Sequence, residues 1–236
     1  DRYIIELYKL SYELNNENGV GINWLCEYHC HHGGGRELAK QELLNYLQKG
    51  WNFDLAFFFG YFTLEYWESS NISLYEQALE LLLECLKEEK ELAAVHNNLG
   101  QLYLNLNQIE KAIQHLDLSI EIDPHLCNPY YVKSRVYEQL NDFARMEEWA
   151  HKAVEIDRFY IQSYIQLSIA VHLQGRTKEA LQWIEQLLEI DEANLNGHYN
   201  KACFLSVIGD VEKAFENLQF VLANEDEDGY YLELAD

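Results

Sequence analysis

Apolar residues recur along most of the chain at steps of three and four positions, which is the spacing of one face of an α-helix. In residues 93–126 they form two such runs, and a short break at 105–108 separates the runs. The pattern therefore predicts two amphipathic helices joined by a tight turn. No segment shows a convincing strand pattern, so the predicted fold class is all-α.

The predicted helix pair recurs every 34 residues, and several independent series of residues share this period. The first helices carry a small residue at each interval, namely Gly100, Ser134, Ser168 and Ala202. The second helices carry a corresponding series, namely Ala78, Ala112, Met146, Ala180 and Ala214. Closely packed helices leave room only for small side chains where their backbones approach. The period therefore predicts an array of paired helices.

Polar residues at the turns predict where the second helices begin. Side chains that accept hydrogen bonds are favoured at the N-cap, because they pair with backbone amides of the first turn. The residues predicted to cap the second helices are Asn107, Asp142, Thr177 and Asp210.

The period also divides the chain into units along one array. Regular repeats are predicted at 93–126, 127–160, 161–194 and 195–228, preceded by a repeat at 53–92 whose inner turn is six residues longer. A degenerate repeat is predicted at 20–52, an N-terminal helix or cap at 1–19, and the start of a capping helix at 229–236.

The residue pattern resembles the tetratricopeptide repeat family. Residues 93–126 match best, through Leu99, Gly100, Tyr103, Ala112 and Pro124. Residues 127–160 depart most, since Lys133 stands where the family has leucine and Met146 where it has alanine. The resemblance implies a right-handed superhelical solenoid of antiparallel helix pairs. It also implies a concave groove, lined mainly by the first helices, that binds a peptide or partner segment.

By this resemblance, spacing from the small residue of each first helix identifies the groove residues. They are mostly amides and tyrosines: Asn97, Asn98, Gln101, Asn128, Tyr131, Arg135, Gln162, Ile165, Gln166, Asn196, Tyr199 and Asn200, with Ile169 and Cys203 in the same row. An amide side chain offers both a donor and an acceptor, so this row suits the backbone of a bound peptide. The alternative is that these residues are solvated helix positions without a ligand.

The earlier repeats place aromatic residues at the same spacing. The possible anchor patch consists of Trp24, Tyr28, Phe57, Phe58 and Tyr61. Tryptophan and tyrosine dominate binding hot spots, so the patch suits apolar anchors of a partner. The alternative is that these rings pack between repeats.

Charge narrows the choice of partner. The chain has 17 Lys and Arg against 40 Asp and Glu, for a net charge of −23. Binding to nucleic-acid phosphates or anionic membranes needs clustered Lys and Arg, so neither is expected. No apolar run approaches the roughly 18 residues of a membrane span, so no membrane insertion is expected. A protein or peptide partner that is neutral or basic is favoured.

The only metal-like cluster in the sequence is Cys26, His29, Cys30, His31 and His32, and the first three share one face if they are helical. Thiolate and imidazole ligands suit zinc, but no second pair of ligands is evident. The alternative is a helix end that runs into the glycine-rich turn at 33–35. No nucleophile, phosphate loop or acid–base pair stands out, so neither enzymatic activity nor a cofactor is expected.

The sequence therefore predicts a protein–protein interaction module that acts as an adaptor, scaffold or chaperone-like protein. The five cysteines do not suggest a disulfide framework, which favours a cytoplasmic location. The chain begins with Asp1 and no signal-like stretch follows, which suggests a piece of a longer protein. Two alternatives stay open: a regulatory or targeting part of a larger protein, and a zinc-binding module at residues 26–32. Oligomeric state and partner identity stay undetermined.

Overall fold

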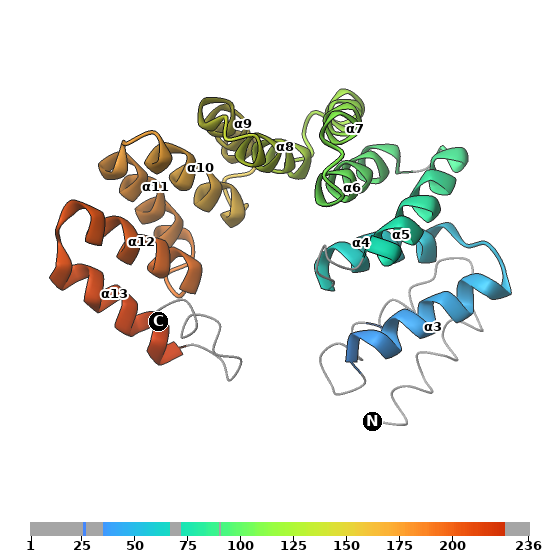
Figure 1. Ribbon diagram of the computed structural model, residues 1–236, viewed down its shortest axis with the longest axis horizontal. Helices are drawn as coiled ribbons and strands as arrows, with labels where there is room; N and C mark the ends of the chain where they lie inside the picture. The colour runs from blue at the N-terminus through green and yellow to red at the C-terminus, as the bar shows by residue number, and fades with distance from the viewer. Residues whose placement is uncertain (1–25, 27–34, 67–71, 90, 225–236) are drawn as a thin grey trace. The chain divides into compact units, whose positions relative to one another are not determined.

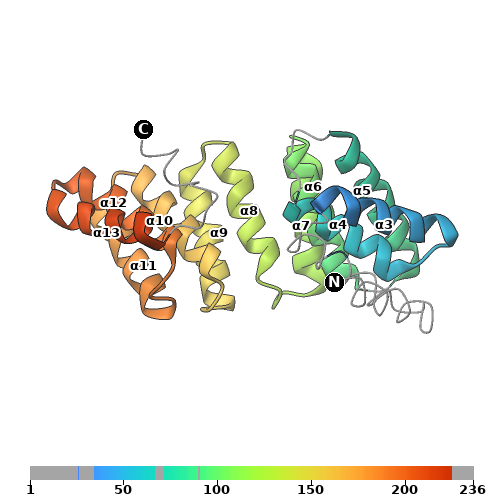
Figure 2. The same ribbon diagram turned by 90° about the horizontal axis from the view of Figure 1, so that it is seen from below.

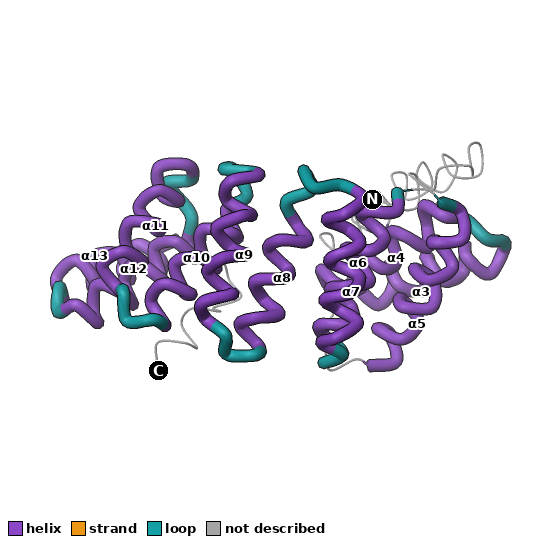
Figure 3. Tube along the Cα trace, turned by 90° about the horizontal axis from the view of Figure 1, so that it is seen from above, coloured by secondary structure: helices purple, strands orange, loops and turns teal. Residues whose placement is uncertain are grey.

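The computed structural model describes residue 26 and residues 35–66, 72–89 and 91–224. In this part of the chain the regular structure is helical and contains no strand (Figure 3), so the predicted all-α fold class is confirmed. A short 3₁₀ turn, η1, spans Leu86–Glu88. The α-helices are α3 (Gly35–Lys49), α4 (Phe53–Tyr66), α5 (Ile72–Cys85), α6 (Leu92–Asn105), α7 (Ile109–Ile122), α8 (Asn128–Gln139), α9 (Phe143–Ile156), α10 (Ile161–Leu173), α11 (Thr177–Ile190), α12 (Leu195–Ile208) and α13 (Val211–Asn224).

The chain divides into two compact units, Asp1–Asp123 and Pro124–Asp236. The first unit contains α3 to α7, in which α4 pairs with α5 and α6 pairs with α7. The second unit contains the pairs α8/α9, α10/α11 and α12/α13, which follow one another in chain order (Figures 1 and 2). Within this unit α10 also packs on α9 and α12 on α11, so each new pair extends the core of the previous pair.

Small residues lie where paired helices come closest. A Cβ atom on Gly100 would be 2.6 Å from Cγ of Leu116, and a Cβ on Gly60 would be 2.8 Å from Cγ of Leu82. The same glycine–leucine contact therefore forms in α6/α7 and in α4/α5. The glycine and leucine are 16 residues apart in α6/α7 and 22 apart in α4/α5. The longer separation includes residues 67–71, which lie outside the described residues.

A second contact fixes the alignment of each pair from α6 onwards. It joins residues 19 positions apart, namely His96–His115, Tyr130–Trp149, Tyr164–Trp183 and His198–Asn217. The two middle pairs bring ring centroids to 6.0 and 6.4 Å, whereas the outer two bring polar atoms to 2.8 Å. The four helix pairs are thus aligned in the same way, two of them through contacts between aromatic rings and two through contacts between polar atoms.

The structure corrects two of the four predicted caps. Asp142 and Asp210 accept hydrogen bonds from the backbone amide three residues later, at 3.1 and 3.4 Å. Asn107 is not the cap, because its φ of 57° is left-handed and Gln108 occupies the cap position of α7. Thr177 is already the first residue of α11, so the cap lies one residue earlier.

The elements predicted at 1–19 and 229–236 lie outside the described residues, as does most of the first half of the repeat predicted at 20–52.

Candidate functional site

The first helices of the second unit form a continuous surface, because α10 contacts both α8 and α12. We call this surface the first-helix face. It comprises the predicted groove residues of this unit, namely Asn128, Tyr131, Arg135, Gln162, Ile165, Gln166, Asn196, Tyr199 and Asn200.

Tyr160 contacts two residues at the N-terminal end of α8 and so orders that part of the face. Its hydroxyl donates a hydrogen bond to Oδ1 of Asn128 at 3.4 Å. Its ring also meets the ring of Tyr131 edge-on, with centroids 5.5 Å apart and an interplanar angle of 74°. Tyr160 is not among the residues predicted from the sequence, because it precedes α10 and so falls outside the spacing measured along the first helices.

Gln166 connects α10 to α8. Its Nε2 donates to a carboxylate oxygen of Glu138 at 2.7 Å, and the residue is only 6% exposed. Gln166 therefore holds two helices in place and is largely inaccessible to a ligand. Asn200 is also engaged, since its Nδ2 donates to the backbone carbonyl of Asn196 at 2.8 Å.

Most predicted residues of the face are accessible. Gln162 and Asn196 are exposed, and Arg135 and Ile165 are among those that are partly exposed. Within the described part of the chain, no hydrogen bond or ion pair engages the Arg135 guanidinium or the Gln162 amide. Most other described cations do contact a partner, as Arg176 does with Glu147 and Glu179. Arg135 is therefore an available donor on the same first-helix face as Gln162 and Ile165.

The predicted residues of the first unit are less accessible. Asn97 and Asn98 of α6 are buried, and Nδ2 of Asn97 donates to Oδ1 of Asn98 at 3.2 Å. The Oδ1 atom of Asn97 is buried without a hydrogen-bond partner. Only Gln101 of this group is partly exposed. Two of the three residues thus belong to the packed interior of their helix pair.

The described part of the predicted aromatic patch lies on α4. Phe57 is partly buried and stacks on Phe53, with ring centroids 6.0 Å apart. The ring centroids of Phe58 and Tyr61 are 6.0 Å apart, and Tyr61 is 40% exposed. The other two predicted members, Trp24 and Tyr28, lie outside the described residues.

Of the weak metal candidates, only Cys26 is described. Its thiol is buried and donates to the carbonyl of Ala39 at 3.5 Å. His29 and Cys30 lie outside the described residues. Elsewhere in the described segments, no three His, Cys, Asp or Glu side chains converge in a way that could hold a metal ion.

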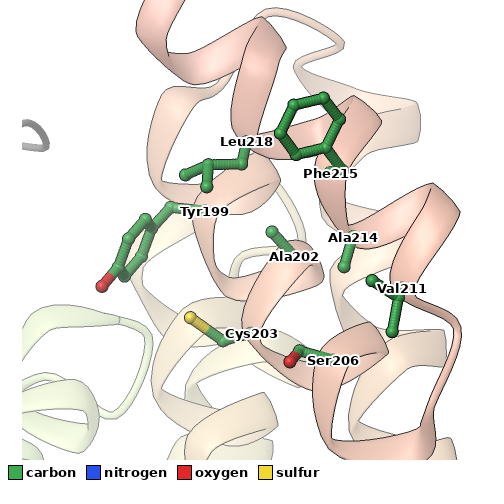
Figure 4. A pocket seen from close by; sticks show the side chains of 8 residues that line it. All are labelled: Tyr199, Ala202, Cys203, Ser206, Val211, Ala214, Phe215 and Leu218. Carbon is green, nitrogen blue, oxygen red and sulfur yellow. The ribbon is translucent and has the colours of Figure 1, made fainter. Parts of the chain in front are cut away.

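A pocket that the sequence did not predict lies between α12 and α13 (Figure 4). We call it the end pocket. Its volume is about 500 Å³, and it is lined by Tyr199, Ala202, Cys203, Ser206, Val211, Ala214, Phe215 and Leu218. Burial raises the pKa of the Cys203 thiol, and a hydrogen bond from Tyr199 partly offsets this rise. Tyr199 belongs to both surfaces, so the end pocket adjoins the first-helix face.

None of the described helices combines the length and apolarity that would let it cross a lipid bilayer.

Solved structures with a similar arrangement of helices include two with TM-scores of 0.57. One is MamA, at 15% sequence identity, where the match covers 69% of this chain and 95% of that protein. The other is a thermophilic TPR protein of Thermus thermophilus, at 18% identity, where it covers 66% of this chain and 86% of that protein. At these identities the likeness concerns the fold. No curated protein sequence matches the chain.

The family assignment comes from the repeats themselves. Family models described as "Tetratricopeptide repeat" match residues 93–126, 128–160 and 161–194. These matches coincide with the helix pairs α6/α7, α8/α9 and α10/α11, and the solved neighbours have the same fold. Residues 93–194 of the chain are therefore tetratricopeptide repeats.

Proposed function

We propose that the first-helix face binds an extended segment of a partner protein, so that the chain acts as an adaptor, scaffold or chaperone-like module. Repeat proteins of this kind use the long surfaces created by stacked repeats for binding. The observation that carries the proposal is the accessible group of Arg135, Gln162 and Ile165 on α8 and α10.

Contacts between neighbouring side chains order the surface around this group before any ligand binds. Tyr160 holds Asn128 and Tyr131, and Glu138 holds Gln166. A surface that is already ordered loses less conformational entropy when a ligand binds. Arg135 and Gln162 can donate to backbone carbonyls of an extended peptide, while Ile165 contacts an apolar side chain.

The partner is a neutral or basic protein segment. The chain carries a net charge of −23, which attracts basic partners and repels nucleic acid and acidic ones. We propose neither a catalytic activity nor a cofactor. The proposed cytoplasmic location rests on the cysteines, which are thiols rather than disulfides throughout the described residues.

A peptide selection tests this proposal. The full chain selects binders from a displayed library of random peptides roughly a dozen residues long, and fluorescence polarisation then gives the Kd of each selected peptide. Gln162→Ala and Ile165→Ala are expected to raise Kd at least about fivefold each, which corresponds to about 1 kcal/mol.

The matched control is Gln186→Ala, because Gln186 is also an exposed glutamine but lies on the second helix α11. This variant should leave Kd unchanged. Selected peptides that bind the Gln162→Ala/Ile165→Ala double variant as tightly as the original chain would refute the first-helix face as the binding site. Circular dichroism verifies that each variant is folded.

A further inference from the structure

Equivalent positions of α8, α10 and α12 form two columns along the first-helix face. The apolar column consists of residues 34 positions apart, namely Tyr131, Ile165 and Tyr199. The amide column begins three residues earlier in each helix and consists of Asn128, Gln162 and Asn196. Residues three positions apart are neighbours on a helix surface, so the two columns run side by side. All six residues are at least partly exposed, and the face thus offers one apolar and one polar contact in each repeat.

Helix packing sets the distance between successive contacts in a column. The helix α10 contacts both α8 and α12, and packed helices lie about 8–10 Å apart. A segment that crosses the three helices must therefore present an apolar side chain about every 8–10 Å.

Two extended conformations differ in whether they meet this spacing. A β-strand repeats its side chains on one side every two residues, which is about 6.6 Å. A polyproline II helix repeats them every three residues, which is about 9.3 Å. The polyproline II helix therefore matches the apolar column, whereas the β-strand loses register after one repeat.

The side chains of the apolar column suit proline. Proline-rich segments in the polyproline II conformation bind in grooves that are lined by aromatic side chains. Tyr131 and Tyr199 supply aromatic rings, and Ile165 is the aliphatic member between them in chain order. The ring of Tyr131 is held by its edge-on contact with Tyr160, with centroids 5.5 Å apart. Figure 4 shows the ring of Tyr199 extending from the same side of α12 as the thiol of Cys203.

The polar groups of the face suit a backbone that is rich in acceptors. A polyproline II backbone makes no internal hydrogen bonds, and each proline lacks an N–H group. Such a ligand therefore presents mainly carbonyl oxygens. The Arg135 guanidinium only donates, the Gln162 amide supplies two further N–H groups, and neither is engaged by a partner among the described residues.

We propose that the partner segment is a polyproline II helix with proline at every third position, so that one proline contacts each of Tyr131, Ile165 and Tyr199. This inference rests on the proposed function, because it names the ligand of the same face. The ligand is extended before it binds and loses little conformational entropy. Proline is uncharged, so lysines between the prolines make the segment basic and complementary to a chain of charge −23.

Two fluorescent peptides test the spacing on the full chain. Both are roughly a dozen residues long and contain the same number of prolines among lysine, alanine and glutamine. One has proline at every third position and the other at every fourth. Circular dichroism verifies that their polyproline II content is similar. Fluorescence polarisation should give a Kd at least about tenfold lower for the peptide with the three-residue spacing, which corresponds to about 1.4 kcal/mol.

A double-mutant cycle tests the contact with the apolar column. Replacing each proline in turn by alanine should raise Kd, and for one interior proline the loss should be much smaller on the Ile165→Ala chain, because these two groups contact each other. The matched control is Ile190→Ala, since Ile190 is also an accessible isoleucine, 37% exposed, but ends the second helix α11. This variant should leave every Kd unchanged.

The outcomes distinguish the polyproline ligand from the proposed function itself. Library peptides that bind the first-helix face but lack proline at every third position would overturn the polyproline ligand alone. Equal Kd values for the two spacings would do the same. If neither the probes nor any library peptide binds the face, both proposals fail. Tighter binding at the three-residue spacing, together with coupling between one proline and Ile165, supports the polyproline ligand.

Discussion

The contact between Gly100 and Leu116 leaves no space for an added carbon. A Cβ at residue 100 would also lie 3.3 Å from the backbone oxygen of Ala112, so the backbone of the second helix adds a tight contact to the one with Leu116. The small residue at this point is thus required by the distance between the two helices.

Replacing Gly100 should expose this constraint. Gly100→Ala is expected to lower the free energy of unfolding by about 1–3 kcal/mol through overpacking. Leu116→Ala is expected to cost about 2–5 kcal/mol through the cavity it leaves. Because the smaller side chain makes room for the added carbon, the double variant should lose less than the sum. Urea unfolding measures all three values.

Gly50→Ala is the control for that cycle, since a Cβ there meets no atom within 4 Å. It should change stability little. Strict additivity in the Gly100 and Leu116 cycle would contradict the close contact.

The His96–His115 pair is the clearest pH-sensitive contact among the described side chains. The Nδ1 atoms lie 2.8 Å apart, so one neutral ring donates and the other accepts. Burial lowers the pKa of His96. Burial, followed by the charges of His96 and Lys111, lowers the pKa of His115 to about 4. Both rings therefore resist protonation in the folded chain.

The sign of the pH effect follows from these lowered pKa values. Below about pH 6.5 these histidines become protonated in the unfolded chain but stay neutral in the folded chain. The free energy of unfolding therefore falls as the pH is lowered toward about 4. His115→Asn keeps a hydrogen-bonded pair of the kind formed by His198 and Asn217, and it removes one titrating group.

This variant should lose about 1 kcal/mol less stability than the original chain between about pH 7 and about pH 5, because partial exposure of His115 reduces the full effect. Urea unfolding at the two pH values measures the difference. The same pH dependence in both proteins would show that His115 titrates normally in the folded state.

Single positions differed in how far the sequence could predict them. The small residues were evident, because a period of 34 repeats the same steric demand at Gly100, Ser134 and Ser168. The Gln166–Glu138 hydrogen bond was not evident, since it joins two helices across 28 residues and depends on side-chain conformation. Accessibility on the first-helix face depends on such contacts and could not be read from spacing.

The caps of the second helices α7, α9 and α11 were predictable to within one residue. The apolar spacing and the period gave the paired helices, but two caps were displaced. At Asn107 a left-handed φ of 57° moves the cap to the next residue, and Asn141 adopts a similar φ of 54° one repeat later. Residue type alone does not reveal which residue of a turn takes the left-handed conformation.

The start of α12 depends on a cap that can be tested. Asn194 accepts a hydrogen bond from the Gly197 amide at 2.9 Å. Asn194→Ala should lower the free energy of unfolding by about 1 kcal/mol, whereas Asn194→Asp should retain most of the stability, because aspartate caps equally well. Thermal unfolding followed by circular dichroism measures both. Equal losses in the two variants would indicate that the cap does not stabilise α12.

For the molecule as a whole, the period was enough to predict the fold, because each repeat contacts only its neighbours. The end pocket was not predictable in this way. Phe215 and Leu181 occupy equivalent positions in sequence, and their exposure differs only because a helix follows one of them in the described chain.

The second unit should fold without the first. It contains its own buried clusters, one around Leu167 and Ile184 and another around Met146. A chain of residues 124–236 is expected to show helical circular dichroism and a cooperative thermal transition. A disordered spectrum would show that its repeats need the first unit in order to fold.

The net charge should increase the rate at which a basic peptide associates with the chain. A basic peptide selected on the first-helix face should associate about tenfold more slowly at about 0.5 M salt than at about 0.05 M salt, because screening weakens the attraction of a chain with charge −23. A neutral selected peptide serves as the control and should associate at a nearly constant rate. Equal salt dependence for both peptides would exclude electrostatic steering, and stopped-flow fluorescence distinguishes the two results.

The two glycine–leucine contacts also have a use in protein engineering. Gly60 and Leu82 meet as closely as Gly100 and Leu116, although six more residues separate them along the chain. The turn inside a helix pair can therefore lengthen while the pair keeps its packing. An epitope or a fluorophore-binding sequence inserted in the short turn at 106–108 should then report on the protein in cells without altering its binding surfaces.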